Sequence, residues 1–189
     1  MDNIKSNLVK ADMQKLNKLG ELAGQDKDLY YWIETEIRKI PELSGLAEGS
    51  WVENGSLWDI MYVSIRRTNI DSYFIMDGER YVGFIAGVIA TNLDSRQYVR
   101  NIKTFQLEKG SKGSDVRYED ILEKVKEYIA DYYLVCWSSM ISNLDAVNAY
   151  KTFTKRNKGK IEETMEGIRF EIMRGYKWIA GKGWEQENE

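Results

Sequence analysis

The chain has 189 residues, with 27 Lys and Arg, 30 Asp and Glu, and no histidine. The net charge of -3 gives no electrostatic reason to expect general nucleic-acid binding, so any anion site must be local. Without histidine, the chain lacks the imidazole base of most serine and cysteine nucleophiles and the ligand of most zinc sites, and we expect no metal centre.

The length fits one domain with a substantial core, and we expect a body over residues 1–174 and a tail over 175–189. The only cysteine, Cys136, excludes an intramolecular disulfide. Its apolar surroundings favour a buried thiol over a nucleophile, which needs an electropositive, accessible setting. No run approaches about 20 apolar residues. We therefore expect no membrane span and a cytoplasmic protein, or a virion-associated one if the source is a virus.

The first third of the chain predicts a short strand and two helices. Residues 3–9 are weakly β-like, and Asp12 is placed to cap a helix that ends at Gly24. A second helix is predicted over 27–39, stopped by Pro41, because the residue before proline is pushed out of helical geometry. Residues 42–55 hold three glycines and predict an irregular connection.

The middle of the chain contains a strong hairpin signal. Residues 72–76 and 80–90 are β-rich and flank Asp77 and Gly78, which supply the positive φ values of a tight turn. Gly87 inside the second strand weakens it unless a backbone or a ligand comes close or a bulge is needed, and the same holds for Gly83. The preceding residues 57–67 fit a strand or a helix, and their periodicity does not decide. Residues 91–100 are polar and predict a loop.

Residues 101–153 predict a parallel β-α-β unit and a further helix. A strand over 101–108 leads into a basic, glycine-bearing loop over 109–115, and a helix follows from 116 with Ser114 or Asp115 as its cap. A short strand over 132–137 comes next. Asn143 opens the last helix, and its apolar face includes Tyr150. Residues 160–165 and 168–173 predict a terminal hairpin.

This order of elements resembles the GCN5-related N-acetyltransferase (GNAT) superfamily. Residues 4–19 look like its opening strand and helix, and residues 76–85 look like its hairpin, in which a strand reads valine or isoleucine, glycine, phenylalanine. Asn143, Ala146 and Tyr150 are similar to the start of its last helix. The resemblance implies an α/β (α+β) fold with a mixed, largely antiparallel central sheet flanked by helices.

Two departures from the family pattern concern the cofactor. The family's phosphate loop reads Arg or Gln, two residues, Gly, one residue, Gly or Ala. In this chain Gly113 is retained, Gly110 stands at the basic position and Asp115 at the last small one. After Tyr150 the family has a glycine and a phenylalanine where this chain has Thr154 and Lys155.

The resemblance implies acetyl-CoA as cosubstrate. Backbone N–H groups of the loop, at the start of a helix, would face the pyrophosphate, although a plain solvated turn is an equal interpretation. The pantetheine arm would enter between residues 105–107 and 135–137, and Asn143 would contact it or simply cap the helix. The implied cofactor-binding residues are Leu107, Lys109, Gly110, Ser111, Lys112, Gly113, Ser114, Asn143 and Ala146.

The resemblance also assigns the proton transfers. Tyr150 matches the general acid that protonates the departing thiolate, and its alternative is a core aromatic on a helix face. Glu108, at the end of a predicted strand, is the candidate base through water, and its alternative is a solvated charge.

Two functions remain open. One is N-acetyl transfer from acetyl-CoA to an unknown amine, on a small molecule or a protein. The other is a catalytically inactive GNAT-fold protein that serves as a structural or binding component, for example in a virion, with a protein partner or a second copy of itself. A set of aromatic residues fits either an interaction surface or ordinary packing. These residues are Trp51, Trp58, Tyr62, Trp178 and Trp184.

Overall fold

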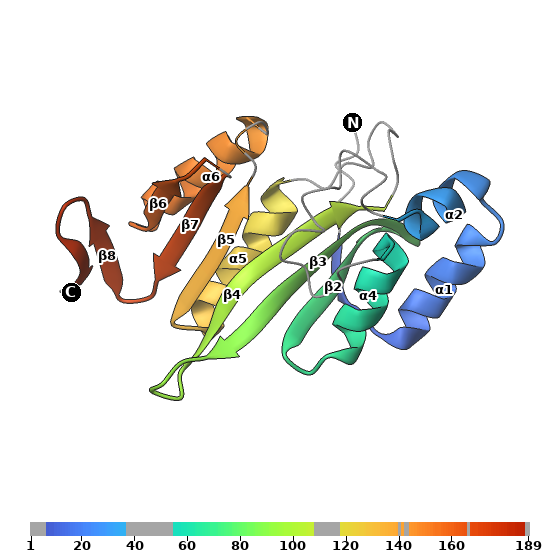
Figure 1. Cartoon of the computed structure of the whole chain (residues 1–189), viewed down its shortest axis with the longest axis horizontal. Coiled ribbons are helices and arrows are strands. Elements are labelled where there is room, and N and C mark those ends of the chain that lie inside the picture. The colour runs from blue at the N-terminus through green and yellow to red at the C-terminus, as the bar shows by residue number, and fades with distance from the viewer. Residues whose placement is uncertain are drawn as a thin grey trace. The chain divides into compact units, whose positions relative to one another are not determined.

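The structure is a computed structural model that describes residues 7–36, 55–107, 118–139, 141, 144–165 and 167–187. The chain divides into two compact units, one formed by Met1–Ala86 with Lys103–Val116 and the other by Gly87–Ile102 with Arg117–Glu189. Figure 1 labels the elements, which in chain order are β1 (Asn7–Lys10), α1 (Met13–Ala23), α2 (Lys27–Glu34), α4 (Leu57–Arg66), β2 (Ile70–Asp77), β3 (Arg80–Thr91), β4 (Gln97–Gln106), α5 (Tyr118–Asp131), β5 (Leu134–Ser139), α6 (Leu144–Arg156), β6 (Lys160–Glu163), β7 (Ile168–Met173), β8 (Tyr176–Ile179) and β9 (Gly183–Gln186).

A seven-stranded sheet runs in the order β1-β2-β3-β4-β5-β7-β6. Within it β4 and β5 are parallel, whereas β1 with β2, β5 with β7 and β6 with β7 are antiparallel. The mixed, largely antiparallel sheet with flanking helices is the predicted fold class, which is thereby confirmed (Figure 1). The predicted parallel β-α-β unit is present, because β4 and β5 are neighbouring parallel strands and α5 connects them along the chain.

The two N-terminal helices begin as predicted, and one of them ends early. The Asp12 carboxylate accepts the Lys15 N–H at 2.8 Å and caps α1, and Gly24 follows its last residue. Helix α2 ends at Glu34, although a helix to residue 39 was expected. Thr35 is extended, with φ -73° and ψ 137°, and its hydroxyl donates to the Tyr31 carbonyl at 2.6 Å, which ends the helix. Pro41 lies outside the described residues.

The undecided segment after residue 56 is the helix α4. The Ser56 hydroxyl accepts the Asp59 N–H, and the Asp59 carboxylate accepts the Ser56 N–H at 2.9 Å, which together form a capping box. The buried face of the helix contains Leu57, Ile60 and Met61. A Ser-x-x-Asp pattern was therefore the signal that decides between strand and helix here.

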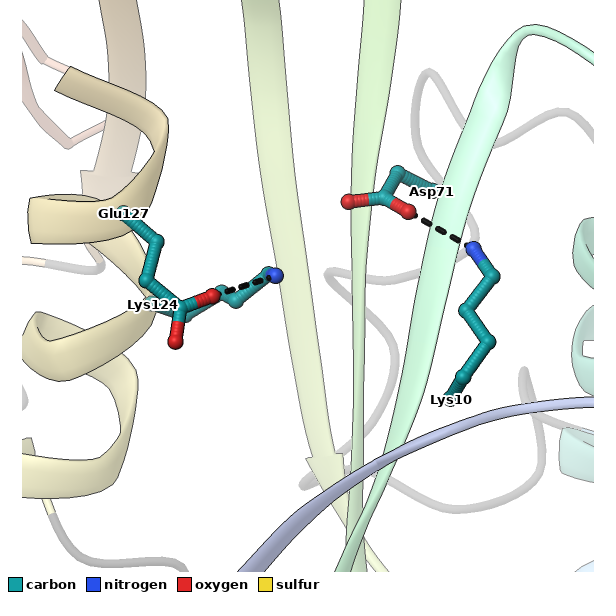
Figure 2. A network of polar contacts seen from close by, with 4 residues as sticks. All are labelled: Lys10, Asp71, Lys124 and Glu127. Carbon is teal, nitrogen blue, oxygen red and sulfur yellow. Dashed lines mark hydrogen bonds and ion pairs between the residues drawn. The ribbon is translucent and has the colours of Figure 1, made fainter. Parts of the chain in front are cut away.

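The hairpin of β2 and β3 has the predicted turn, with Gly78 at φ +61°. Beside it, β1 pairs antiparallel with β2, and the Lys10 ammonium meets the Asp71 carboxylate at 2.6 Å (Figure 2). The pair is exposed, so its contribution to stability is small. The first compact unit, formed by residues 1–86 and 103–116, has an apolar core. This core includes Leu16, Leu19, Ile33, Leu57, Met61, Phe74, Phe84 and Phe105.

The predicted loop over residues 91–100 is wrong, because β4 begins at Gln97. The connection from β3 is a short turn in which the Asn92 side chain accepts the N–H groups of Asp94 and Arg96 at 3.1 and 2.9 Å. Ser95 takes the positive φ of 59°. A side-chain carbonyl that replaces backbone partners allows a tight turn in a stretch that composition alone marks as a long loop.

Helix α5 buries a lysine. The Lys124 side chain is 4% exposed, and its ammonium lies 2.8 Å from the Glu127 carboxylate (Figure 2). The same ammonium lies 4.8 Å from the centre of the Tyr128 ring. A buried ammonium is costly unless it is paired, and here a carboxylate and an aromatic face both offset that cost.

The tail forms a hairpin of its own. Trp178 on β8 lies opposite Trp184 on β9, with ring centres 5.3 Å apart in an edge-to-face arrangement. The Lys160 ammonium lies 4.5 Å from the centre of the Trp178 ring, and the backbone N–H of Trp178 donates to the Lys158 carbonyl at 2.9 Å. These two tryptophans thus have partners within the chain. Trp51 lies outside the described residues.

The glycine within β3 is explained by a close approach. A Cβ atom built on Gly87 would lie 2.6 Å from the hydroxyl of Tyr128, a residue of α5 that is 2% exposed. The close neighbour at this position is a side chain, whereas the sequence suggested a backbone, a ligand or a bulge. Gly87 therefore lets α5 pack its tyrosine directly on the strand backbone.

Replacing Gly87 with alanine should destabilise the fold by about 1–3 kcal/mol, because the new methyl group overpacks the contact with Tyr128. Urea denaturation measures the loss. The same substitution in a Tyr128→Leu background should cost less, since the shorter side chain leaves room. Equal costs in both backgrounds would contradict the contact.

Candidate active site

Tyr150 lies on the buried face of α6 within a group of aromatic side chains. Its ring centre is 5.5 Å from Phe170 on β7, 5.9 Å from Tyr118 on α5 and 6.1 Å from Trp137 on β5, all edge-to-face. With Phe153, these residues form what we call the aromatic cluster. Tyr150 is only 5% exposed, so three elements fix the position of its ring.

Burial also fixes the protonation state of Tyr150. It raises the pKa of the phenol well above its usual value of 10.0, and the neighbouring Tyr118 raises it further. The phenol is therefore neutral at physiological pH. Such a group can donate a proton and is unsuited to accept one as a base.

Trp137 is the residue of this cluster that sequence reasoning undervalued. Its indole is stacked on Phe170 at 5.4 Å and lies edge-to-face with Phe153 at 6.2 Å. Its Nε1 is buried and has no hydrogen-bond partner among the described residues. The sequence placed Trp137 in an apolar strand and carried no signal that it would meet Tyr150; Tyr118 was likewise not anticipated.

Two predicted cofactor contacts lie within the described residues. Ala146 is 2% exposed on α6, one turn before Tyr150. Leu107, just after β4, is fully buried, and its N–H donates to the Val82 carbonyl at 3.1 Å. A cofactor contact from Leu107 would therefore use its carbonyl oxygen.

The other predicted site residues lie outside the described residues and stay predictions. They comprise the candidate base, the whole phosphate loop and the asparagine that opens the last helix. These residues are Glu108, Lys109, Gly110, Ser111, Lys112, Gly113, Ser114 and Asn143.

Strand β5 has a neighbouring strand on each of its two edges. On one edge, β5 pairs with β7 at every residue from Leu134 to Ser139. On the other edge, β5 pairs with β4 at Val99↔Val135, near the start of both strands.

Cys136 is not a candidate nucleophile. It is 2% exposed, and burial, with the nearby Glu171, raises the pKa of its thiol to about 11. A thiol in such surroundings is protonated at physiological pH and unreactive.

The described parts of the chain contain neither a metal site nor a membrane-spanning helix. Among the described residues, no three Cys, Asp or Glu side chains gather as a metal site would require. None of the helices in those ranges combines the length and apolar content that a bilayer crossing requires.

Comparison with known proteins places the fold. No protein-family model and no curated sequence matches the chain. Among solved structures, the aminoglycoside acetyltransferase AAC(6')-Ib, in complex with coenzyme A and kanamycin, has a TM-score of 0.54 at 14% identity, over 90% of this chain and 95% of that one. The dodecameric spermidine N-acetyltransferase of Vibrio cholerae has a TM-score of 0.55 at 11% identity, over 92% and 96%.

A third match is the GNAT domain of PAT from S. lividans, with a TM-score of 0.52 at 8% identity over 89% of this chain and 90% of that one. The chain has the GNAT fold. At these identities the likeness is one of architecture, and it confirms the fold that the sequence predicted for a GNAT-like chain. A shared architecture shows neither the acceptor nor whether the chain is active.

The raised pKa of Tyr150 predicts a loss of stability at high pH. The folded state keeps the phenol neutral, whereas the unfolded chain ionises it from its usual pKa of 10.0, so stability falls as pH rises above that value. Urea denaturation at pH 9 and pH 11 should show that the wild type loses up to about 1.4 kcal/mol per pH unit more than Tyr150→Phe. The same pH dependence in both proteins would contradict a buried phenol.

The burial of Cys136 predicts a slow thiol. With a disulfide reagent at pH 8, the native protein should react at least about 100-fold more slowly than the urea-unfolded chain, since a thiol of pKa about 11 is almost entirely protonated. Cys136→Ser serves as the blank. Rapid labelling of the native protein would reopen the nucleophile interpretation.

Proposed function

We propose that this protein is an N-acetyltransferase that transfers an acetyl group from acetyl-CoA to an amine. The observation that carries the proposal is Tyr150, a neutral phenol held by the aromatic cluster one turn after Ala146 in a GNAT fold. Tyr150 matches the general acid that the resemblance implies. The two acetyltransferases compared above are enzymes of this reaction class.

The proposed reaction begins with a neutral amine that attacks the thioester carbonyl carbon of acetyl-CoA. The tetrahedral intermediate collapses, the carbon–sulfur bond breaks, and the thiolate receives the proton of Tyr150. The amine nitrogen loses its proton to water, with Glu108 as the proposed base. The products are the acetylated amine and free coenzyme A, and solvent returns the proton to Tyr150.

The proposed cofactor site uses the loop from Lys109 to Ser114 for the pyrophosphate. Backbone N–H groups at a helix start favour an anion there, and Lys109 with Lys112 adds positive charge. The pantetheine arm would then follow the contacts that the resemblance implies. Asn143 and the Leu107 carbonyl would contact that arm.

The proposed acceptor is an amine of a small molecule or a protein. The compared enzymes are named for aminoglycosides and for spermidine, both of which carry amines. These two compounds are therefore the first acceptors to assay.

Acetyl-CoA binding is the first test. Isothermal titration should give a saturable heat with the wild type, and Gly113→Glu should weaken binding at least about tenfold, because a carboxylate would then stand in the phosphate loop. Glu119→Gln, a change at an exposed position of α5, is a control that should leave binding intact.

No heat at millimolar acetyl-CoA would rule out the acetyltransferase function and favour the alternative, a catalytically inactive GNAT-fold protein. The departures at Gly110 and Asp115 favour that alternative. Binding that Gly113→Glu leaves unchanged would move the pyrophosphate away from this loop.

Tyr150→Phe should lower kcat by about 100-fold or more and leave KM for acetyl-CoA nearly unchanged, since an acid used only as the thiolate departs acts in the transition state. Release of coenzyme A thiol with kanamycin or spermidine measures the rate. Phe153→Leu, which alters the cluster without removing a hydroxyl, is the matched control. An equal loss in both variants would make Tyr150 a packing residue.

A further inference from the structure

A second candidate site lies in the unit that contains α5, β5 and β7. It is a solvent-open cavity of about 480 Å³ whose lining is mostly polar. Its lining comes from the end of β3, the turn after it, the start of β4, the end of α5, the α5–β5 connection and the residue after β7. The lining residues are Thr91, Ser95, Arg96, Gln97, Asp131, Tyr133 and Arg174. None of these residues belongs to the aromatic cluster or to the proposed cofactor site.

The turn presents Arg96 in a fixed position. Asn92 accepts the Arg96 N–H through its side-chain oxygen at 2.9 Å, and its own N–H donates to the Arg96 carbonyl at 3.0 Å. The Asn92 amide also donates to the Tyr133 hydroxyl at 2.7 Å. The turn is thus bonded at both ends of Arg96 and to the opposite wall of the cavity.

Tyr133 supports the Arg96 side chain directly. The Arg96 guanidinium lies 3.9 Å from the centre of the Tyr133 ring, which is the geometry of a cation–π contact. The Tyr98 ring lies edge-to-face with Tyr133 at 6.0 Å. A guanidinium stacked on a ring keeps its N–H donors at the edge free for an anion.

Arg174 is held on the third wall. Its backbone N–H donates to the Tyr133 carbonyl at 2.8 Å, and its Nη1 donates to the Ala130 carbonyl at 2.6 Å near the end of α5. One guanidinium nitrogen is therefore bonded to the helix. The other guanidinium N–H groups of Arg174 make no hydrogen bond among the described residues.

The charges of the cavity do not cancel. Two guanidinium groups face one carboxylate, that of Asp131, and among the described residues neither arginine forms an ion pair with it within 4.0 Å. Two planar, positioned donors in a polar cavity match the oxygens of a phosphate or a carboxylate, which bind arginine through paired hydrogen bonds.

We propose that this cavity binds a small anion through Arg96 and Arg174, with a phosphate or carboxylate group as the part recognised. Asp131 lies where it would accept a hydrogen bond from a hydroxyl or ammonium elsewhere on the same ligand. The proposal is independent of acetyl transfer, because it uses neither Tyr150 nor the phosphate loop.

The test is an NMR titration of the full-length, ¹⁵N-labelled protein with inorganic phosphate and, separately, with glutarate, at ionic strength held constant with sodium chloride. Saturable shifts are expected at the backbone amides of Asn92–Tyr98, Tyr133 and Arg174, with a millimolar dissociation constant for at least one anion. Phosphate and glutarate together separate a phosphate site from a general carboxylate site.

Three variants make the result specific. Arg96→Gln and Arg174→Gln should each weaken binding about tenfold, as expected for loss of one charge-assisted contact. Arg100→Gln removes an exposed arginine of β4 outside the cavity and should leave binding unchanged. Each spectrum also reports whether its variant is folded, so a loss caused by unfolding of Arg174→Gln would be recognised and Arg96→Gln would decide.

The proposal fails if neither anion gives saturable shifts at concentrations up to about 50 mM, which is about 50-fold above a dissociation constant of about 1 mM. It also fails if the shifts are confined to the amides of residues 109–115, which would place the anion in the loop proposed for the cofactor. Equal affinity of Arg96→Gln and Arg100→Gln would show that the cavity arginines do not bind the anion.

Discussion

The enclosure of Tyr150 by aromatic side chains from β5, β7 and α5 is the constraint on which the candidate active site depends. Each edge-to-face pair adds about 0.5–1.5 kcal/mol beyond the area that it buries. The packing that stabilises this part of the fold therefore also positions the phenol and keeps it neutral. One set of contacts therefore stabilises the fold and positions the proposed proton donor.

This dual use has a cost at Trp137. An indole N–H that is buried without a partner costs about 1–3 kcal/mol relative to one that is bonded. The described residues offer no acceptor to Trp137 Nε1, while its ring contacts Tyr150, Phe153 and Phe170. The aromatic contacts of the Trp137 ring thus offset the free-energy cost of its unbonded indole N–H.

Local sequence signals predicted the elements whose boundaries are set by neighbouring residues. Asp12 caps α1, and Gly78 supplies the turn of the β2–β3 hairpin as expected. The failures involved side-chain hydrogen bonds to the backbone that the composition of the segment does not reveal. Thr35 ends α2 through the Tyr31 carbonyl, and Asn92 shortens the loop before β4. At the site, the sequence identified Tyr150 by resemblance, but its neighbours Tyr118 and Trp137 come together through the tertiary fold alone.

The buried lysine of α5 bears on how this helix can change in evolution. Lys124 lies against its own Glu127 and the ring of Tyr128, and Tyr128 in turn rests on the bare backbone of Gly87. A mutation at any one of these positions alters the surroundings of the next. Drift along this side of the helix is therefore expected to proceed by paired replacements, with the glycine as the last member of the group to change.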